Sequence, residues 1–296
     1  MMRLLTLTSF LALIVFSIPV NAQTPAKAQQ PPIPAEEEAN DHADLIETIK
    51  LGDLPAVSTL LFAGVSPDTP ADDGSRPLCW AVRVNRGDIV ELLLEKGADV
   101  NAEEDDEGTV LDVAAMSGHA DLVKLLLSHG AAVNHTDHGG HTALMMSAMG
   151  AMITEIPHFV LQTICDRDEN DRREALLANP GHEHREVMDL LLEAGANADL
   201  QATDCDLTAL MIAAMAGKVE LVQTLLKHKV KVNIKNDEGE ALKFVETIET
   251  IDSPEGIAEL LEGEDEQSAT VWLSWLRLTA PGRREVAKLL RAAGAQ

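Results

Sequence analysis

Apolar residues recur along this chain in blocks that repeat about every 33 positions. Each block is a Val- and Leu-rich segment that ends in a short polar turn and, in most copies, in Gly-Ala followed by Asn or Asp. The clearest copies are Ile89–Asn101, Leu122–Asn134, Val187–Asp199 and Leu221–Asn233. A fixed period of this length is typical of repeat architectures, in which each unit buries its apolar face against its neighbours.

Four leucines set the register of the repeat. Leu78, Leu111 and Leu144 follow one another at exact intervals of one period, and Leu210 lies two periods beyond Leu144. Each of them opens a short apolar segment, which a turn separates from the second apolar segment of the same repeat. The pattern predicts an all-α fold of about six helix-turn-helix repeats over residues 41–296.

Two of the repeats are longer than the others. In the third repeat, the glycine after the second helix (Gly130) lies 19 positions after the leucine that opens the first helix (Leu111). The same separation is 51 positions in the fourth repeat (Leu144 to Gly195) and 52 in the sixth (Leu242 to Gly294). We therefore expect insertions at about 151–183 and 249–281, between the two helices of each repeat. Such insertions either carry function or add packing.

The N-terminal segment before the repeats has a different character. Arg3 precedes an almost unbroken apolar run that ends at Val20, and Asn21-Ala22 places small residues at a cleavage position. This pattern is typical of a secretory signal peptide over residues 1–22, and the Pro- and Glu-rich residues 23–40 predict an extended linker. We expect a periplasmic or secreted protein with no stable membrane insertion after cleavage. The alternative is a retained membrane anchor, for which the run is at the short limit.

The charge of the chain narrows the class of partner. It carries 49 acidic and 23 basic residues, a net charge of −26. Such a field repels phosphate backbones, so nucleic acid is a poor partner. It favours a basic protein partner, although the charge also serves solubility alone.

Cysteine usage predicts a fold held together by packing. The chain has three cysteines, too few for a disulfide framework. We expect Cys79 to be half-buried and inert. Cys165 is expected in the first insertion and Cys205 on a turn at the opposite end of the stack, so no disulfide between them is expected.

Several segments resemble the ankyrin-repeat family. The helix starts Thr142-Ala-Leu144 and Thr208-Ala-Leu210, the turn Gly118-His119 and the ending Gly97-Ala-Asp-Val-Asn101 match its motifs, and the resemblance covers about residues 41–295. It implies a solenoid of stacked helix pairs whose turn tips project as fingers. It also implies a monomeric, non-catalytic module that binds another protein on the concave surface made by the fingers and the first helices. With its export signal, the chain is similar to exported bacterial ankyrin-repeat proteins that support other envelope enzymes.

The resemblance carries a set of candidate binding residues onto this sequence. Some lie on the fingers and some lie five residues after the motif leucine, where the first helix is expected to be exposed. The candidate partner-binding residues are Asp72, Asp73, Ser75, Arg83, Asp105, Asp106, Met116, His138, His141, Met149, Asp204, Asp206 and Met215.

Three methionines among these candidates predict an apolar strip. Met116, Met149 and Met215 occupy equivalent positions, so on an exposed ridge they would form a soft, adaptable surface flanked by acidic fingers. The hypothesis is that this surface binds a partner with basic and apolar groups. In the alternative, the methionines tuck back against the neighbouring helix.

A second hypothesis is a soft-metal (copper) or redox-protective protein. Its ligands would be nitrogens and thioethers from His135, His138, His141, Met145, Met149 and Met152. Polar residues are ordinary on a finger, however, which favours a structural role for the histidines, and we assign no metal ligands and no cofactor. The sequence shows no serine–histidine–acid arrangement and no glycine-rich phosphate loop, so we do not expect an enzyme.

Overall fold

The computed structural model describes residues 41–71, 74–104, 108–153, 183–236, 241–243, 245–246 and 266–295. The predicted signal peptide and linker lie outside the described residues, as do positions 154–182 of the first expected insertion and 249–265 of the second. The helices are α2 (Asp41–Lys50), α3 (Leu54–Phe62), α4 (Pro77–Arg83), α5 (Gly87–Glu95), α6 (Val110–Ser117), α7 (Ala120–Ser128), α8 (Ala143–Ile153), α11 (His184–Glu193), α12 (Ala209–Met215), α13 (Val219–Lys227) and α16 (Glu266–Ala292). Two short strands, β1 (Glu103–Glu104) and β2 (Gly108–Thr109), pair antiparallel.

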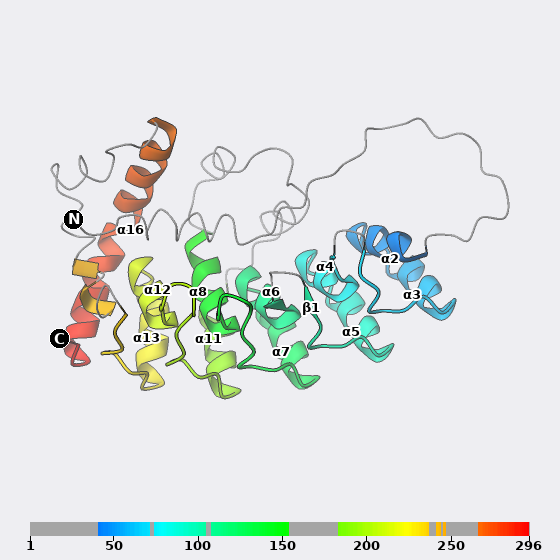
Figure 1. The fold of residues 1–296 in the computed structure, drawn as a ribbon, viewed down its shortest axis with the longest axis horizontal. Coiled ribbons are helices and arrows are strands. Elements are labelled where there is room, and N and C mark those ends of the chain that lie inside the picture. The colour runs from blue at the N-terminus through cyan, green and yellow to red at the C-terminus, as the bar shows by residue number, and fades with distance from the viewer. Residues whose placement is uncertain are drawn as a thin grey trace.

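The helices form two layers that run the length of an elongated stack (Figure 1). One layer is formed by the first helices of the repeats, where α2, α4, α6, α8 and α12 contact one another in that order. The other is formed by the second helices, where α3, α5, α7, α11 and α13 do the same, and α16 closes the end against α12 and α13. The prediction of an all-α ankyrin-type solenoid is confirmed.

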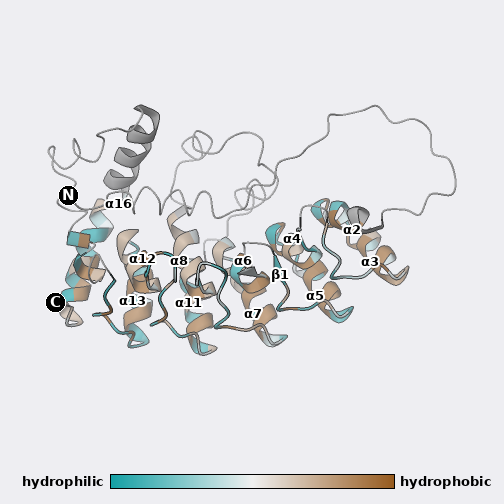
Figure 2. Ribbon diagram, viewed as in Figure 1, coloured by the Kyte–Doolittle hydropathy of each residue, from teal (hydrophilic) through white to brown (hydrophobic). Residues whose placement is uncertain are grey.

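A single apolar core runs between the two layers. It is continuous from Leu45 in the first helix to Leu290 in the last. In α5, for example, Ile89 and Leu93 are fully buried, while Glu91 and Glu95 on the opposite side are exposed. Figure 2 shows the same division: hydrophobic residues lie on the helices, and hydrophilic residues gather in the loops that join one repeat to the next. Each repeat thus gains its core from its neighbours, as the sequence period implies.

Side chains of Asn and Asp join each repeat to the next. The Oδ1 atom of Asp68 accepts a hydrogen bond from the backbone N–H of Asp99 at 2.9 Å, and Oδ1 of Asn101 accepts one from Ala132 at 2.8 Å. The Oδ1 atom of Asp199 accepts a hydrogen bond from the backbone N–H of Lys231 at 2.9 Å. These Asn and Asp residues end the repeat motif found in the sequence, and here they satisfy backbone groups that helix packing leaves unpaired.

The same hydrogen bonds bridge the first insertion. Asn134 accepts from the backbone N–H of Asn197 at 2.7 Å and donates to the carbonyl of Gly195 at 3.1 Å, across 63 and 61 residues of sequence. Its equivalent in the preceding repeat, Asn101, spans only 31 residues to reach Ala132. Repeats three and four therefore stack in the normal register although the chain between them is longer.

Two helices are longer than their counterparts. The helix α8 has 11 residues and ends at Ile153, where its counterparts α6 and α12 have 8 and 7. The helix α16 has 27 residues and contains Pro281. It begins inside the segment expected to be the second insertion and continues without a break into the last helix of the stack, so that its first turns project beyond the other helices (Figure 1). Among the described residues, none of the helices combines the length and apolar character needed to cross a bilayer.

We predict that Asn134→Ala lowers the free energy of unfolding by about 1–2 kcal/mol, because it removes two hydrogen bonds that join repeats across the insertion. Urea unfolding followed by circular dichroism measures the change. The exposed Thr136 on the same loop provides a control, and Thr136→Ala should change stability by less than about 0.5 kcal/mol. Equal stability of the two variants would contradict a role for Asn134 in holding the stack together.

Candidate partner-binding surface

The fingers are turns that precede the first helices of the repeats, and each is closed by backbone hydrogen bonds. In the second repeat the N–H of Ala71 donates to the carbonyl of Ser75 at 2.9 Å. In the third repeat the strands β1 and β2 close the finger. In the fourth repeat the backbone N–H of Asp137 donates to the carbonyl of His141 at 3.0 Å. In the fifth, the N–H of Ala202 donates to the carbonyl of Leu207 at 3.0 Å. The repeats thus present a row of rigid turns along one edge of the stack.

Fingers four and five are also joined to each other. The carbonyl of Gly139 accepts hydrogen bonds from the N–H groups of Thr203 at 2.7 Å and Asp204 at 3.3 Å. A Cβ atom on Gly140 would lie 2.6 Å from the backbone nitrogen of Thr203, so only glycine allows this approach. On the side of finger five that faces away from finger four, the side-chain amide of Gln201 donates to the backbone carbonyl of Lys235 at 3.0 Å. This part of the surface is therefore held at several points before any partner binds.

The structure divides the predicted finger residues into three groups. Asp72, Asp73, Asp105 and Asp106 lie outside the described residues. His138, Asp204 and Asp206 are exposed, as expected for residues that meet a partner. Ser75 and His141, in contrast, are buried, and each lies two residues before a first helix.

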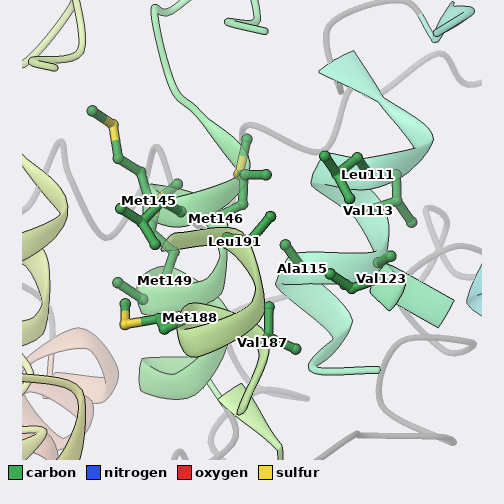
Figure 3. Packing of buried hydrophobic residues seen from close by; sticks show 14 of the residues in the cluster. Leu111, Val113, Ala115, Val123, Met145, Met146, Met149, Val187, Met188 and Leu191 are labelled. Carbon is green, nitrogen blue, oxygen red and sulfur yellow. The ribbon is translucent and has the colours of Figure 1, made fainter. Parts of the chain in front are cut away.

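The exposed methionine ridge predicted from the sequence is wrong. Met149 and Met215 are only 4% and 3% exposed, and Met116 is half-buried. Figure 3 shows Met145, Met146 and Met149 of α8 packed among the apolar side chains of the core. The methionines follow the alternative interpretation, in which they pack against the neighbouring helices.

Neighbouring helices also approach closely near these methionines. A Cβ atom on Gly150 of α8 would collide with the carbonyl oxygen of Met116 in α6. In the same way, a Cβ on Gly282 of α16 would collide with the carbonyl oxygen of Gly217, which lies directly after α12. These glycines let the backbones of neighbouring repeats touch along the edge of the stack opposite the fingers. Nothing in the repeat motif marks these two glycines as contact points, and sequence reasoning missed them.

Arg83, expected to be exposed, forms a buried ion pair. Its guanidinium contacts Glu104 of β1, with Nη1 lying 3.3 Å from Oε1, and the two side chains are 4% and 0% exposed. Glu104 also accepts a hydrogen bond of 2.6 Å from the backbone N–H of Arg76. Removing either partner would leave a buried charge without compensation, which is costly in proteins. The pair therefore locks finger three onto α4, and Arg83 is not available to a partner.

His135, on the finger of the fourth repeat, is held by two carboxylates. Its Nε2 atom lies 2.9 Å from Oε1 of Glu103. Its Nδ1 atom lies 3.8 Å from Oδ2 of Asp112, which is too far for a hydrogen bond but close enough for electrostatic attraction. Asp112 and then Glu103 raise the pKa of His135 to about 9, against the opposing effect of burial. His135 is therefore a cation at neutral pH.

His141 lies between two acidic residues. Its Nδ1 is 3.1 Å from Oδ2 of Asp137, and its Nε2 is 3.5 Å from Oδ1 of Asp204. Burial lowers the pKa of His141, but the hydrogen bond and charge of Asp137, aided by Asp204, outweigh it, so that the pKa lies above its usual value. Burial acts to raise the pKa of Asp137, yet the interaction with His141 holds it below the usual value.

The two described cysteines are free thiols that differ in burial. Cys79 in α4 is fully buried, where the sequence predicted it to be half-buried. Cys205 lies beside His141 on the neighbouring finger, with Sγ 4.0 Å from Nε2. Burial, and then Asp204, raises the pKa of the Cys205 thiol to about 12, so it stays protonated at neutral pH and is a poor nucleophile. Cys165 lies outside the described residues.

The ligand set predicted for a soft metal does not form. Met145, Met149 and Met152 belong to the core, and His135 and His141 are each held by different carboxylates. Within the part of the chain that the structure describes, the group of potential ligands that contains His141 includes neither His135 nor His138.

Sequence comparison identifies the repeat type. A family described as "Ankyrin repeats (3 copies)" matches residues 45–137, 97–156 and 177–245, which together make up more than half of the chain. The chain belongs to the ankyrin-repeat family. Ankyrin repeats are in general non-catalytic modules that bind other proteins, which agrees with the row of rigid fingers described above.

One curated relative matches part of the repeats. It is the "Ankyrin repeat and KH domain-containing protein mask-1" of Caenorhabditis elegans, which is 34% identical over 71 residues. The match covers 24% of this chain and 3% of the relative. It supports the repeat type of the aligned segment.

We predict that the pH dependence of stability reports the His135 site. Because the folded-state pKa of about 9 exceeds the ordinary value of 6.5, the stabilisation by protonated His135 is complete below pH 6.5 and is lost as the pH rises through 9. His135→Gln should therefore cost on the order of 1–2 kcal/mol at pH 6 and much less at pH 9.5, measured by urea unfolding. His129→Gln, at the exposed end of α7, serves as control. A cost that does not vary with pH would show that His135 is not charged in the folded protein.

Proposed function

We propose that this protein is a non-catalytic binding module that acts outside the cytoplasm and holds a partner protein through the fingers of repeats three to five. The observation that carries the proposal is the exposure of His138, Asp204 and Asp206 on turns that are cross-linked to one another and to the stack. A surface that is already ordered loses little conformational entropy when it binds. The first helices contribute less to the proposed binding surface than the sequence suggested, because the described candidate residues on these helices are buried or half-buried.

The chemistry of the partner follows from the charge. The chain has a net charge of −26, and near the fingers the cations Arg83 and His135 are paired with carboxylates. Asp204, Asp206 and Glu103 remain at the surface. The proposed partner is a protein with a basic surface, and its association would be faster at low ionic strength.

We predict that a photo-crosslinking amino acid at position 138 captures a protein partner in cells, whereas the same group at position 129 does not. Both positions carry exposed histidines, but His138 lies on finger four and His129 lies at the end of α7. Capture of the same species from both positions, or from neither, would rule out the finger surface.

A second pair of variants tests the role of charge against the captured partner. The double variant His138→Lys/Asp206→Asn should weaken binding at least tenfold, which is about 1.4 kcal/mol. The matched variant His129→Lys/Glu95→Gln makes the same chemical changes on the second helices and should leave the affinity within about twofold. Equal loss in both variants would mean that net charge, and not the finger surface, controls binding.

The proposed location depends on the N-terminal sequence. The apolar run before Val20, followed by Asn21-Ala22, supports export and cleavage. Intact mass measurement of the protein recovered from its native host should give a chain that begins at Gln23. A chain that retains residues 1–22 in a membrane fraction would support the anchor instead.

A further inference from the structure

Three potential metal ligands from two different repeats meet between fingers four and five. They are the Nε2 atom of His141, the Oδ1 atom of Asp204 and the Sγ atom of Cys205, and they lie within 4.8 Å of one another. His141 belongs to the fourth repeat and the other two to the fifth, so the stacking of the repeats brings the set together. It combines one nitrogen, one oxygen and one sulfur ligand.

The spacing of these atoms fits a tetrahedral zinc ion. Zinc bonds of about 2.0–2.1 Å to nitrogen, about 2.0–2.2 Å to oxygen and about 2.3 Å to sulfur place neighbouring ligand atoms roughly 3.3–3.6 Å apart. Nε2 of His141 lies 3.5 Å from Asp204 and 4.0 Å from Cys205. All three atoms lie within 4.8 Å of one another, so side-chain rotations that shift them by up to about 1 Å would bring the set to bonding distance.

The orientation of His141 is also suited to a metal. Asp137 accepts from Nδ1, at 3.1 and 3.2 Å from its two oxygens, which keeps a proton on Nδ1 and directs Nε2 at Asp204 and Cys205. The lone pair of Nε2 becomes available to a metal once the proton on Nε2 has left. A carboxylate behind the histidine is the usual support of a metal-bound imidazole. The hydrogen bonds from Thr203 and Asp204 to Gly139 hold the two fingers in register at this point.

We propose that His141, Asp204 and Cys205 bind a zinc ion that joins fingers four and five, with Asp137 as a positioning residue. Binding displaces the thiol proton of Cys205 and the proton that imidazolium carries on Nε2 of His141, and both pass to solvent as the zinc–sulfur and zinc–nitrogen bonds form. Asp204 is exposed, so a fourth position is accessible to water or to a side chain of a partner. The thiolate and imidazole favour zinc over magnesium and calcium, which prefer oxygen ligands. The site goes beyond the proposed binding function and does not depend on it.

The test uses the purified full chain, stripped of metal, kept reduced and titrated with cobalt(II) as a spectroscopic probe. Excess magnesium is present throughout to occupy sites made of carboxylates alone. We expect one equivalent of cobalt to produce a thiolate-to-cobalt charge-transfer band that zinc abolishes by displacement. Cys205→Ser should eliminate this band, whereas the matched variant Cys79→Ala, which removes the buried thiol of α4, should retain it. Asp137→Asn should weaken binding by about 10–100-fold, as expected for a supporting carboxylate.

The outcomes separate the site from unspecific binding. Absence of the band in the native chain, or its persistence in Cys205→Ser, would overturn the proposal. Circular dichroism checks that each variant is folded. Should Cys205→Ser fail to fold, Asp204→Asn decides the matter, because Asp204 is exposed and its loss should weaken cobalt binding at least tenfold while the fold remains. Unchanged affinity in Asp204→Asn would equally overturn the site. The experiment contains no partner protein, so its result is independent of whether the fingers bind one.

Discussion

The whole molecule depends on the burial of helix faces between consecutive repeats. A pair such as α6 and α7 cannot enclose an apolar core alone, and its buried residues reach the neighbouring pairs on both sides. The Asn and Asp side chains add a directional element, because each binds a backbone group of the next repeat and so defines how far one repeat is offset from another. The hydrophobic contacts supply the driving force, and the hydrogen bonds select one register among several that apolar packing alone would allow.

This stacking determines which surfaces are available for function. At one end of the first helices, Gly150 and Gly282 let the backbones of neighbouring repeats touch. At the other end, the fingers project from the stack. The longer helices α8 and α16 extend on the closed side, beyond their counterparts (Figure 1). The described residues of the expected insertions, 151–153 in α8 and 266–281 in α16, thus extend these helices away from the fingers, while Asn134 keeps the repeats on either side in contact.

The fingers owe their rigidity to charge as well as to backbone hydrogen bonds. Glu104 is neutralised by Arg83, Asp112 lies close to His135, and Asp137 is bound to His141, so each of these fingers is tied to its own or the preceding repeat. Removing one partner of such a buried pair would leave the other charge uncompensated, so the pairs hold these positions together. The result is a negatively charged edge on which the remaining acidic residues, Asp204 among them, are held in defined positions.

The sequence alone determined the repeat type and the register, because these follow from periodicity and from local turn chemistry. Gly97 and Asn85, for example, adopt the left-handed conformation expected at those turns. It did not determine exposure: Met149 and Met215 were expected to be exposed on the first helices, yet both are buried in the core between neighbouring helices. The pairing of Arg83 with Glu104, and the meeting of His141 with Asp204 and Cys205, likewise join residues from different repeats. Such contacts depend on how one repeat is offset from the next, and only the folded stack sets that distance.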